Sequence, residues 1–408
     1  MTSWEPDGDV LHVRVWLPQA SEPTRCGMLE LLQGRVCRFS YDPLWLRHPA
    51  AFALAPNLPL LAGSFDPPAG CELHPVFEDA GPDRWGRAVI NKVFHPSRRS
   101  PLDYLVLAGE NRIGALGFSA MRESTQSQRQ HVYETADLPA LRDAANALAA
   151  QHPISPAMLR LLQPGSSAGG ARPKAVIRHR DADWIAKFPD REDQVDVAAI
   201  EHASLQLASL CGITVAESEL IALSGQHVLL VRRFDRDAGS RIHFASARTL
   251  LIADGLKEGD MGYADLADVL RREARAPQAD CQQLFRRMVF NVLIENTDDH
   301  EKNHALLFQQ GHWNLSPAFD LQPQLLGVGY QSLRLGKQGA QALLSNALSD
   351  CGRFMLKSVE AMHIASEVLA QMRQWEQVFA RCGVSNADID ACRHFILRPS
   401  VLASWSAH

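Results

Sequence analysis

A short polar stretch that follows an apolar helical pattern carries residue types suited to phosphoryl transfer. Within it, Asp298 and Asn303 form the pattern Asp-x-x-x-x-Asn. A carboxylate can orient an attacking hydroxyl group and accept its proton, while an amide oxygen at this spacing can bind Mg²⁺ beside the transferred phosphoryl group. A solvated turn after a helix that ends at Asn296 is the simpler interpretation, and this loop alone does not decide between the two.

Three charged residues elsewhere in the chain would complete such a site. Lys187 ends a short apolar strand, where it could pair with nucleotide phosphates. Glu201 lies beside the apolar face of a helix predicted for 197–210, from which it could hold that lysine. Asp320 follows a strand predicted for 305–308 and could be a second metal ligand. Each has an ordinary alternative: a lysine at a strand edge, a solvated glutamate and a helix-capping aspartate.

The segment 163–174 is rich in glycine, alanine and serine. Small residues let the backbone approach a ligand closely, and successive N–H groups can form a concave site for phosphate. The segment lacks the Gly-x-x-x-x-Gly-Lys-Ser pattern of a P-loop, and it precedes a predicted hairpin rather than a helix. Protein kinases cover nucleotide phosphates with a glycine-rich loop between strands, although a plain flexible turn has the same composition.

The order of these features is more specific than any one of them. A glycine-rich hairpin, a strand lysine, a helix glutamate, an apolar strand at 227–231, the Asp-x-x-x-x-Asn loop and a later aspartate follow one another along the chain. The parts of a protein-kinase active site occur in the same order. Agreement among several independent motifs favours an ATP-dependent phosphotransferase.

Composition and charge narrow the class of protein. The 408 residues suffice for two or three domains, and 46% hydrophobic with 21% charged residues is typical of a globular protein. A formal net charge of -5 argues against broad electrostatic binding of nucleic acid by this chain alone. The 8 cysteines are scattered without a Cys-x-x-Cys pair, which indicates reduced thiols. Neither a secretory signal nor a membrane-spanning apolar stretch is visible, so we expect a cytoplasmic protein.

Periodicity predicts an α+β fold in three parts. An N-terminal α/β subdomain covers 1–125, a kinase-like N-lobe 138–235 and a mostly helical C-lobe 236–408, with a polar linker at 122–137. The expected elements are strands at about 10–17 and 114–118, hairpins at 27–39 and 175–188, and helices at 82–94, from 101, and at 137–150, 197–210, 263–275, 281–296, 356–380 and 386–396. The first hairpin should turn at Gln33 and Gly34, and Asp83 should be a helix cap or an ion-pair partner of Arg87 rather than a substrate contact. The helix at 281–296 has one apolar face, made of Phe285, Met288, Val289, Val292 and Leu293.

Together the motifs resemble those of the HipA family of serine/threonine kinase toxins. The resemblance extends from the N-terminal subdomain to about residue 325. It implies a two-lobed protein-kinase-like fold with an extra N-terminal subdomain. The matching stretches lie at 81–87, 113–116, 167–174, 185–189, 231–236, 297–303 and 317–320.

The resemblance implies a role for each site residue. Asp298 would be the catalytic base, with Lys187 and Asn303 completing the catalytic set and Glu201 giving structural support. Asn303 and Asp320 would bind Mg²⁺. ATP would contact the glycine-rich segment, the hinge and the catalytic loop, through Gly169, Gly170, Ala171, Arg172, Pro173, Lys174, Lys187, Arg232, Arg233, Phe234, His300, Glu301, Lys302, Asn303 and Asp320.

The resemblance also implies autoregulation. In the family, a serine that opens the glycine-rich loop is autophosphorylated, which displaces the loop; Ser167 matches it and Ser166 is its neighbour. Phosphate adds up to about two negative charges, so ATP affinity would fall. The chain departs from the family pattern at three places. Arg232 stands where family members often have an acidic residue, and Arg172 and Pro173 stand where a Gln-Glu pair is familiar. Asp299 replaces a more usual glycine and could bind metal or be solvated.

The implied function is an ATP- and Mg²⁺-dependent serine/threonine protein kinase that acts as a HipA-like toxin on a cytosolic protein. Targets in the family include aminoacyl-tRNA synthetases. The expected partner is a HipB-like helix-turn-helix antitoxin, through which most DNA contact would occur, and no membrane contact is expected. The alternatives are a small-molecule kinase on the same scaffold and a kinase-like binding module without catalysis; the intact set of Asp298, Asn303, Asp320 and Lys187 argues against the module.

Overall fold

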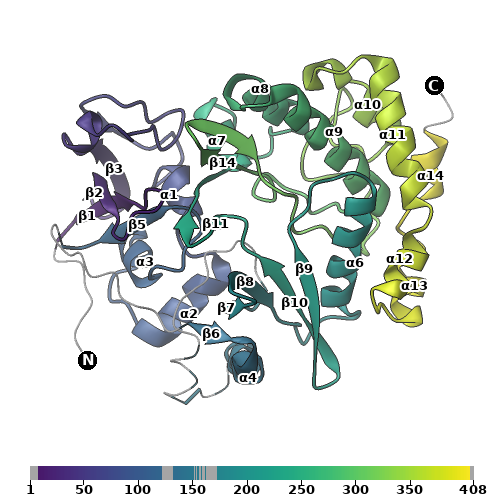
Figure 1. Cartoon of the computed structure of the whole chain (residues 1–408), viewed down its shortest axis with the longest axis horizontal. Coiled ribbons are helices and arrows are strands. Elements are labelled where there is room, and N and C mark those ends of the chain that lie inside the picture. The colour runs from purple at the N-terminus through teal and green to yellow at the C-terminus, as the bar shows by residue number, and fades with distance from the viewer. Residues whose placement is uncertain are drawn as a thin grey trace.

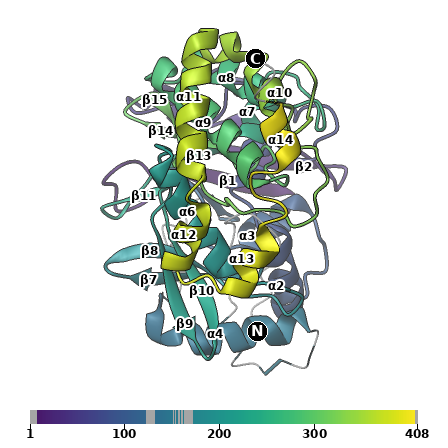
Figure 2. The same cartoon turned by 90° about the vertical axis from the view of Figure 1, so that its right-hand side faces the viewer.

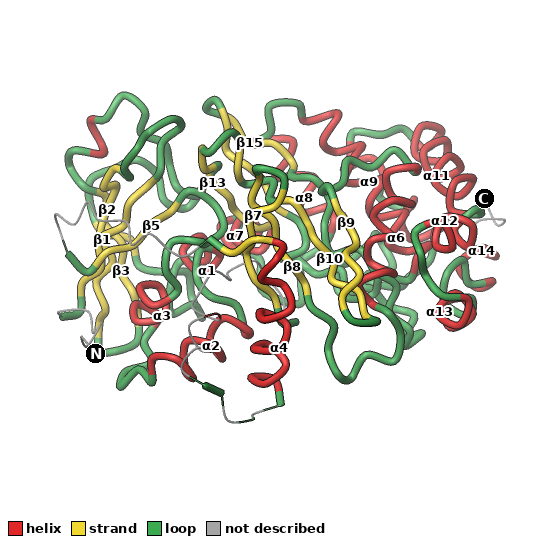
Figure 3. The backbone as a smooth tube through the Cα atoms, turned by 60° about the horizontal axis from the view of Figure 1, so that its bottom comes forward, coloured by secondary structure: helices red, strands yellow, loops and turns green. Residues whose placement is uncertain are grey.

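Three parts lie side by side along the long axis of the molecule. The computed structural model describes residues 8–121, 132–150, 152, 154, 155, 158, 161 and 172–404. A strand-rich N-terminal part lies at one end, a second sheet in the middle and a helical part at the other end (Figure 1, Figure 3). The α+β class predicted from the sequence is confirmed.

The N-terminal part is built on an antiparallel sheet with strand order β4-β3-β2-β1-β5. Leu11 and Val13 of β1 are fully buried on one face, because alternate side chains of a strand point to the same side. The predicted turn lies at Gln33 and Gly34, which have φ of 50° and 72°. The elements are β1 (Val10–Val15), β2 (Thr24–Leu32), β3 (Val36–Tyr41), β4 (Ser64–Phe65), β5 (Leu116–Ser119), α1 (Pro75–Asp79), α2 (Arg84–Phe94), α3 (Pro101–Leu107) and the 3₁₀ turn η1 (Trp45–Arg47).

The middle part is a sheet with strand order β6-β7-β8-β10-β9. Its central strand β10 is apolar on both faces: Val228 and Leu230 share a core with α2 and α4, whereas Leu229 and Val231 pack with α6. A strand covered on both faces needs this continuous apolar run. The elements are β6 (Tyr133–Glu134), η2 (Thr135–Asp137), α4 (Leu138–Ala149), β7 (Lys174–His179), β8 (Ala182–Lys187), α6 (Val197–Leu210), β9 (Ser218–Leu223) and β10 (Gln226–Arg232).

Part of the predicted linker belongs to this sheet. Residues 122–131 lie outside the described part of the chain, but Tyr133 and Glu134 pair in parallel with Ile177 and Arg178 of β7. The Tyr133 ring is only 8% exposed and joins the core of the sheet. The linker prediction is therefore wrong at its C-terminal end, because one buried aromatic ring and a strand pairing outweigh the polar surroundings.

The C-terminal part is a helical lobe around α9 (Pro277–Ile294). The apolar residues predicted for one face of α9 are at most 1% exposed, and α11 runs beside it (Figure 2). The other helices are α7 (Ala247–Ala253), α8 (Tyr263–Glu273), α10 (Leu344–Leu348), η3 (Cys351–Phe354), α11 (Ser358–Met372), α12 (Trp375–Arg381), α13 (Asn386–Cys392) and α14 (Pro399–Ala403). The strands of this part are β11 (Arg236–Asp237), β12 (Ser240–Arg241), β13 (His243–Ser246), β14 (Ala305–Gln309) and β15 (His312–Leu315).

The single helix predicted for 356–380 is wrong, because the chain forms two helices, α11 and α12. Gln374 departs from helical geometry, with φ -97° and ψ 13°. After this break, Trp375 and Phe379 of α12 pack beside α6, where they are 5% and 0% exposed. Apolar residues on both sides of the break keep helical spacing, so periodicity could not locate it.

The cysteines and the lengths of the helices bear on two further expectations from the sequence. All 8 cysteines carry free thiols, as predicted from their scattered positions. Within the described part of the chain, no helix has both the length and the apolar character that spanning a membrane requires.

Polar contacts attach the N-terminal part to the helical lobe. The carboxylate of Asp79, at the end of α1, accepts hydrogen bonds from the backbone N–H and hydroxyl of Ser246, both at 2.7 Å, and from the hydroxyl of Thr249 at 2.6 Å. On β13, His243 Nε2 donates to the carbonyl of Leu54 at 2.8 Å. The N-terminal part is therefore fixed to β13 and α7 rather than loosely tethered.

The buried His243 makes stability depend on pH. Burial lowers the pKa of His243 to about 4, from an ordinary value of 6.5. Between these pH values the unfolded chain binds a proton that the folded chain does not, so the unfolding free energy falls by about 3 kcal/mol as pH falls. His243→Gln keeps a donor for the Leu54 carbonyl but does not titrate, so urea unfolding at each pH should show a shallower dependence than in the wild type.

The exposed His394 provides the matched control. Its ring is solvated in both states, so His394→Gln should keep the wild-type pH dependence. Equal slopes for wild type and His243→Gln would contradict the prediction.

Candidate active site

Lys187 joins three elements at the boundary between the middle sheet and the helical lobe. Its Nζ donates to Glu201 Oε1 and to Asp320 Oδ1, at 2.7 Å in each case. Lys187 ends β8, Glu201 belongs to α6, and Asp320 follows β15, 133 residues later. The Glu201 side chain is 3% exposed, whereas those of Lys187 and Asp320 are 16% and 35% exposed. The structure thus brings together three residues selected from the sequence, with the aspartate on the open side.

Local structure explains why these side chains meet. Asp196 caps α6 by accepting a hydrogen bond from the N–H of Ala199 at 3.0 Å, which starts the helix just before Glu201. Ala198 packs against Leu229, so α6 lies directly under the strand beside β8. Asp320 has a φ of 58°, a left-handed conformation that aspartate adopts more readily than most residues.

Charge pairing decides the protonation of this cluster. Burial lowers the pKa of Lys187, but Asp320 and Glu201 oppose it more strongly, so the pKa lies above its ordinary value. Burial raises the pKa of Asp320, yet Lys187 lowers it further, with a net downward shift. For Glu201 burial is the larger effect and the pKa is raised. A cation is therefore held at a partly open site, where an anion could reach it.

The Asp-x-x-x-x-Asn stretch forms a closed loop at the end of α9. The helix ends at Ile294 and is capped by Glu295, which has left-handed geometry with φ 63°, so the cap lies one residue before the one considered from the sequence. Asn296 is buried, and its side chain donates to Asn291 Oδ1 at 3.2 Å. Asn303 Nδ2 donates to the backbone carbonyl of Asp298 at 3.3 Å. The two predicted active-site residues are thus tied to one another, with the Asp298 side chain exposed and Asn303 buried.

The carboxyl group of Asp298 has a pKa above its ordinary value in water. Partial burial raises the pKa of its carboxyl group; His300 opposes this, and the nearby carboxylates of Asp320 and Asp299 add to it. A carboxylate whose pKa is raised in this way is a stronger proton acceptor than free aspartate.

Asp299 is an anchor for the loop. It is 1% exposed, accepts a hydrogen bond from the hydroxyl of Tyr263, and lies 2.9 Å from His304 Nε2. Asn291 of α9 donates in turn to the Tyr263 hydroxyl at 3.0 Å. The suggestion of a solvated Asp299 is therefore wrong, because its carboxylate turns into the protein and ties the loop to α8 and α9.

Two residues predicted as metal ligands carry the kind of oxygen donor that suits Mg²⁺. Mg²⁺ sites with nucleotides use one or two carboxylates together with phosphate oxygens and water, rather than an all-protein cage. Asp320 and Asn303 supply a carboxylate and an amide oxygen of this kind. Within the described ranges, no group of three His, Cys, Asp or Glu side chains could hold a metal alone. These residues fit Mg²⁺ bound together with a nucleotide and do not fit a resident metal.

Predicted phosphate contacts lie only partly within the described structure. Ser166, Ser167, Gly169, Gly170 and Ala171 fall outside the described residues. Of the rest of this segment, Arg172 makes two hydrogen bonds to Asp193, at 2.7 and 2.8 Å. Pro173 accepts through its carbonyl from the N–H of Phe188 at 2.9 Å, and Lys174 Nζ lies 2.6 Å from Asp83 Oδ2.

The predicted hinge uses two of its three backbone N–H groups inside the protein. The N–H of Arg232 donates to the carbonyl of Glu217 at 2.8 Å, and that of Arg233 to the carbonyl of Asp183 at 2.9 Å. The Arg232 side chain is exposed and pairs with Glu217 at 2.8 Å. An adenine contact at this segment would therefore use Phe234 or the carbonyl groups.

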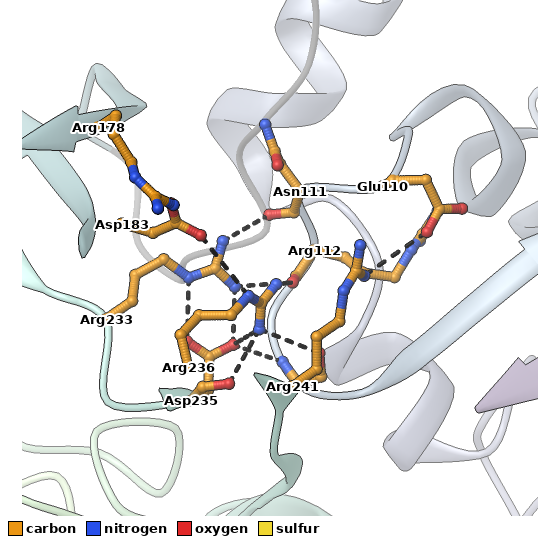
Figure 4. Close-up of polar contacts among 10 residues, drawn as sticks. Glu110, Asn111, Arg112, Arg178, Asp183, Arg233, Asp235, Arg236 and Arg241 are labelled. Carbon is orange, nitrogen blue, oxygen red and sulfur yellow. Dashed lines mark hydrogen bonds and ion pairs between the residues drawn. The ribbon is translucent and has the colours of Figure 1, made fainter. Parts of the chain in front are cut away.

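The Arg233 side chain points away from this edge, into a polar cluster with the N-terminal part. Figure 4 shows Arg233 and Arg236 converging on Asp235, with bonds from Arg233 to the carbonyls of Asn111 and Arg112 at 3.1 and 2.8 Å. Burial raises the pKa of Asp235, but the two guanidinium groups lower it well below its ordinary value. The hinge is thus fixed to the N-terminal part by buried charge.

The other predicted loop residues serve the loop or its neighbours. His300 Nδ1 accepts from the N–H of Lys302 at 3.2 Å, which closes a tight turn. The carbonyl of Glu301 accepts from the N–H of Arg248 on α7 at 3.2 Å. The Lys302 side chain is exposed. Their contacts with ATP stay predictions.

Comparison with known proteins decides the family. The HipA N-terminal domain matches residues 13–119, and the HipA-like C-terminal domain matches residues 166–376, about half of the 408 residues. This chain belongs to the HipA-like family. The family predicted from the motifs is confirmed.

Named relatives cover part of this HipA-like chain. Y4mE and Y4dM of Sinorhizobium fredii, both named as candidate kinases, are 29% and 30% identical to it over 169 and 179 residues. These regions are 38% and 40% of this chain and 38% and 43% of those proteins, so the chain spans less than half of their length.

A solved structure matches nearly the whole HipA-like chain. It is the toxin–antitoxin complex of HipA, HipB and operator DNA from Shewanella oneidensis MR-1. The match covers 98% of this chain and 97% of that chain, with a TM-score of 0.70 and 16% sequence identity. At this identity the likeness concerns the fold, and the predicted kinase-like fold with an extra N-terminal subdomain is confirmed.

Sequence reasoning missed two features of the site. It treated Asp83 as a cap or a partner of Arg87, and the cap is present, but the ion-pair partner is Lys174. It also missed the buried partners of Asp299, which are Tyr263 and His304. Asp83 and Lys174 are 91 residues apart, and no periodic pattern links positions that meet only in the folded chain.

Glu201→Gln should weaken ATP binding about tenfold, which corresponds to about 1.4 kcal/mol. The substitution leaves Lys187 with one carboxylate partner, Asp320, and so loosens the cation that would meet the phosphates. Equilibrium titration with a fluorescent ATP analogue measures the change. Glu376→Gln is the control. Glu376 also pairs with an arginine or lysine side chain, here Arg393, but its side chain is 45% exposed, whereas that of Glu201 is 3% exposed. Equal affinity in Glu201→Gln and wild type would refute the prediction.

Proposed function

We propose that this HipA-like chain is an ATP- and Mg²⁺-dependent serine/threonine protein kinase that acts as a toxin on a cytosolic protein. The observation that supports it most is the Lys187 ammonium held between Glu201 and Asp320. A kinase uses a strand lysine, paired with a helix glutamate, to hold nucleotide phosphates, and a nearby aspartate to hold the metal.

The chain's own residues would divide the work as follows. Asp298 orients the hydroxyl group of the substrate and accepts its proton, aided by the raised pKa of its carboxyl group. Lys187 neutralises charge on the phosphates, while Glu201 keeps it in place. Asn303 and Asp320 would hold Mg²⁺, which supplies charge neutralisation at the phosphoryl oxygens when it is bound. Catalysis of this kind is mainly positioning and electrostatic stabilisation.

Regulation and partners complete the proposal. We propose autophosphorylation at Ser167 or its neighbour Ser166, which would place negative charge beside the ATP phosphates and reduce affinity. Because the Shewanella oneidensis HipA structure also contains HipB and operator DNA, we propose a HipB-like helix-turn-helix antitoxin as partner and DNA contact mainly through it. The proposed location is the cytoplasm.

Phosphopeptide mass spectrometry after expression tests the function. The wild type should carry phosphate on the peptide that contains Ser166 and Ser167, and should phosphorylate a lysate protein when ATP and Mg²⁺ are supplied. Asp298→Asn should reduce both by about 10²–10⁴-fold, the usual effect of removing a general base. Asp181→Asn is the matched control, since Asp181 is an exposed turn residue with φ 61° that asparagine suits equally well.

Three outcomes would contradict the proposal. Equal phosphorylation by wild type and Asp298→Asn would exclude Asp298 as the base. Mg²⁺-dependent ATP consumption without any phosphopeptide would indicate a small-molecule kinase. Nucleotide binding without turnover would indicate a binding module.

A further inference from the structure

One carboxylate of the N-terminal part reaches the strand pair that carries Lys187. Asp83 Oδ1 accepts from the N–H of Gly86 at 2.7 Å and so caps α2, while Asp83 Oδ2 lies 2.6 Å from Lys174 Nζ. The side chains of Asp83 and Lys174 are 10% and 2% exposed. A surface ion pair contributes little, but a pair buried to this extent is costly to break, because the remaining charge then lies away from water with one opposite charge fewer.

Lys174 is placed directly opposite the active-site lysine. It opens β7, and its cross-strand partner in β8 is Lys187. The bond from the N–H of Phe188 to the carbonyl of Pro173, at 2.9 Å, continues the ladder beyond this pair. Whatever fixes the start of β7 therefore also fixes the end of β8, where Lys187 leaves the sheet.

The charges around Lys174 also indicate that Asp83 holds this lysine in place. Burial lowers the pKa of Lys174, Asp83 raises it, and the neighbouring Lys187 lowers it again. The Lys174 ammonium is buried and the Lys187 ammonium on the adjacent strand is partly buried, so the two charges repel one another. Asp83 supplies Lys174 with a counter-charge that comes from neither Glu201 nor Asp320. Removing that counter-charge would drive Lys174 away from Lys187 or compel it to lose its proton.

Apolar packing holds α2 against the same hairpin. Trp85 and Val89 of α2 are 6% and 2% exposed, and they share a core with Ile177 of β7 and with Trp184 and Phe188 at β8. Asp83 thus acts from a helix whose position relative to the hairpin is fixed.

We propose that Asp83 is a positioning residue for the nucleotide site: through Lys174 it fixes the β7–β8 hairpin that presents Lys187 to the phosphates. The inference rests on the proposed function. If Asp83 has this role, the N-terminal part contributes to nucleotide binding, since movement of α2 would change the affinity for nucleotide.

Asp83→Asn separates the ion pair from the helix cap. Asparagine caps helices as well as aspartate does, so α2 keeps its cap while Lys174 loses the negative charge of Asp83. The affinity for a fluorescent ATP analogue should fall about tenfold or more, since small misplacements of a binding group have effects of this size. In the nucleotide-free protein, amide hydrogen exchange in β7 and β8 should become faster.

A double-mutant cycle tests whether Asp83 acts through Lys174. Lys174→Met should weaken ATP binding to a similar extent, and the double variant Asp83→Asn with Lys174→Met should be no weaker than either single variant. Both changes remove the same pair, so their effects should not add. Additive effects would overturn the inference.

Ser100→Ala is the matched control. Ser100 caps α3 in the same N-terminal part, accepting from the N–H of Asp103 at 3.3 Å, and within the described residues its side chain bonds to Asp103 and not to the hairpin. It should lower stability without changing ATP affinity or exchange in β7 and β8. Equal weakening of ATP binding by Ser100→Ala and Asp83→Asn would show a merely structural role and overturn the inference.

The same measurements separate this inference from the proposed function. A wild type that binds no ATP would refute the proposed function and the inference with it. A wild type that binds ATP, with unchanged affinity and exchange in Asp83→Asn, would refute the positioning role alone.

Discussion

The structure depends on one partly buried cation shared by two carboxylates. Lys187 belongs to β8 of the middle sheet, and Glu201 belongs to α6, which packs beneath that sheet. Asp320 belongs to the C-terminal part and follows β15. A lysine at this depth needs opposite charge to remain protonated, so the pair fixes the relative positions of both lobes at the point where they meet. The partial exposure of Asp320 leaves one side of this cluster accessible.

Rigid supports surround this accessible side. The loop with Asp298 and Asn303 is tied to α8 and α9 through the buried Asp299, and α9 itself lies in the centre of the largest core. From the opposite direction, the hinge is fixed to the N-terminal part by Arg233 and Asp235. Polar groups held in this way by a second set of buried partners keep their geometry when charge develops at the site.

The sequence predicted most of what local patterns determine. The apolar face of α9, the turn at Gln33 and Gly34 and the helix cap at Asp83 follow from periodicity and turn chemistry. The order of charged residues located Lys187, Glu201 and Asp320, which the structure brings together. The sequence could not show which distant residues pair in the folded chain, such as Lys174 with Asp83, because spacing along the chain carries no signal for such pairs. It also missed the break before Trp375, where both helices keep apolar spacing.

The central claim is that one nucleotide with Mg²⁺ binds where the amine of Lys187 meets the carboxylate of Asp320. A crystal structure with a non-hydrolysable ATP analogue and Mn²⁺, with anomalous scattering used to locate the metal, tests it most directly. We predict a metal peak bonded to Asp320 and Asn303, with nucleotide phosphates on Lys187 and the Asp298 carboxylate facing the terminal phosphate. Nucleotide and metal bound elsewhere on the molecule, with the Lys187 cluster unchanged and unoccupied, would contradict it.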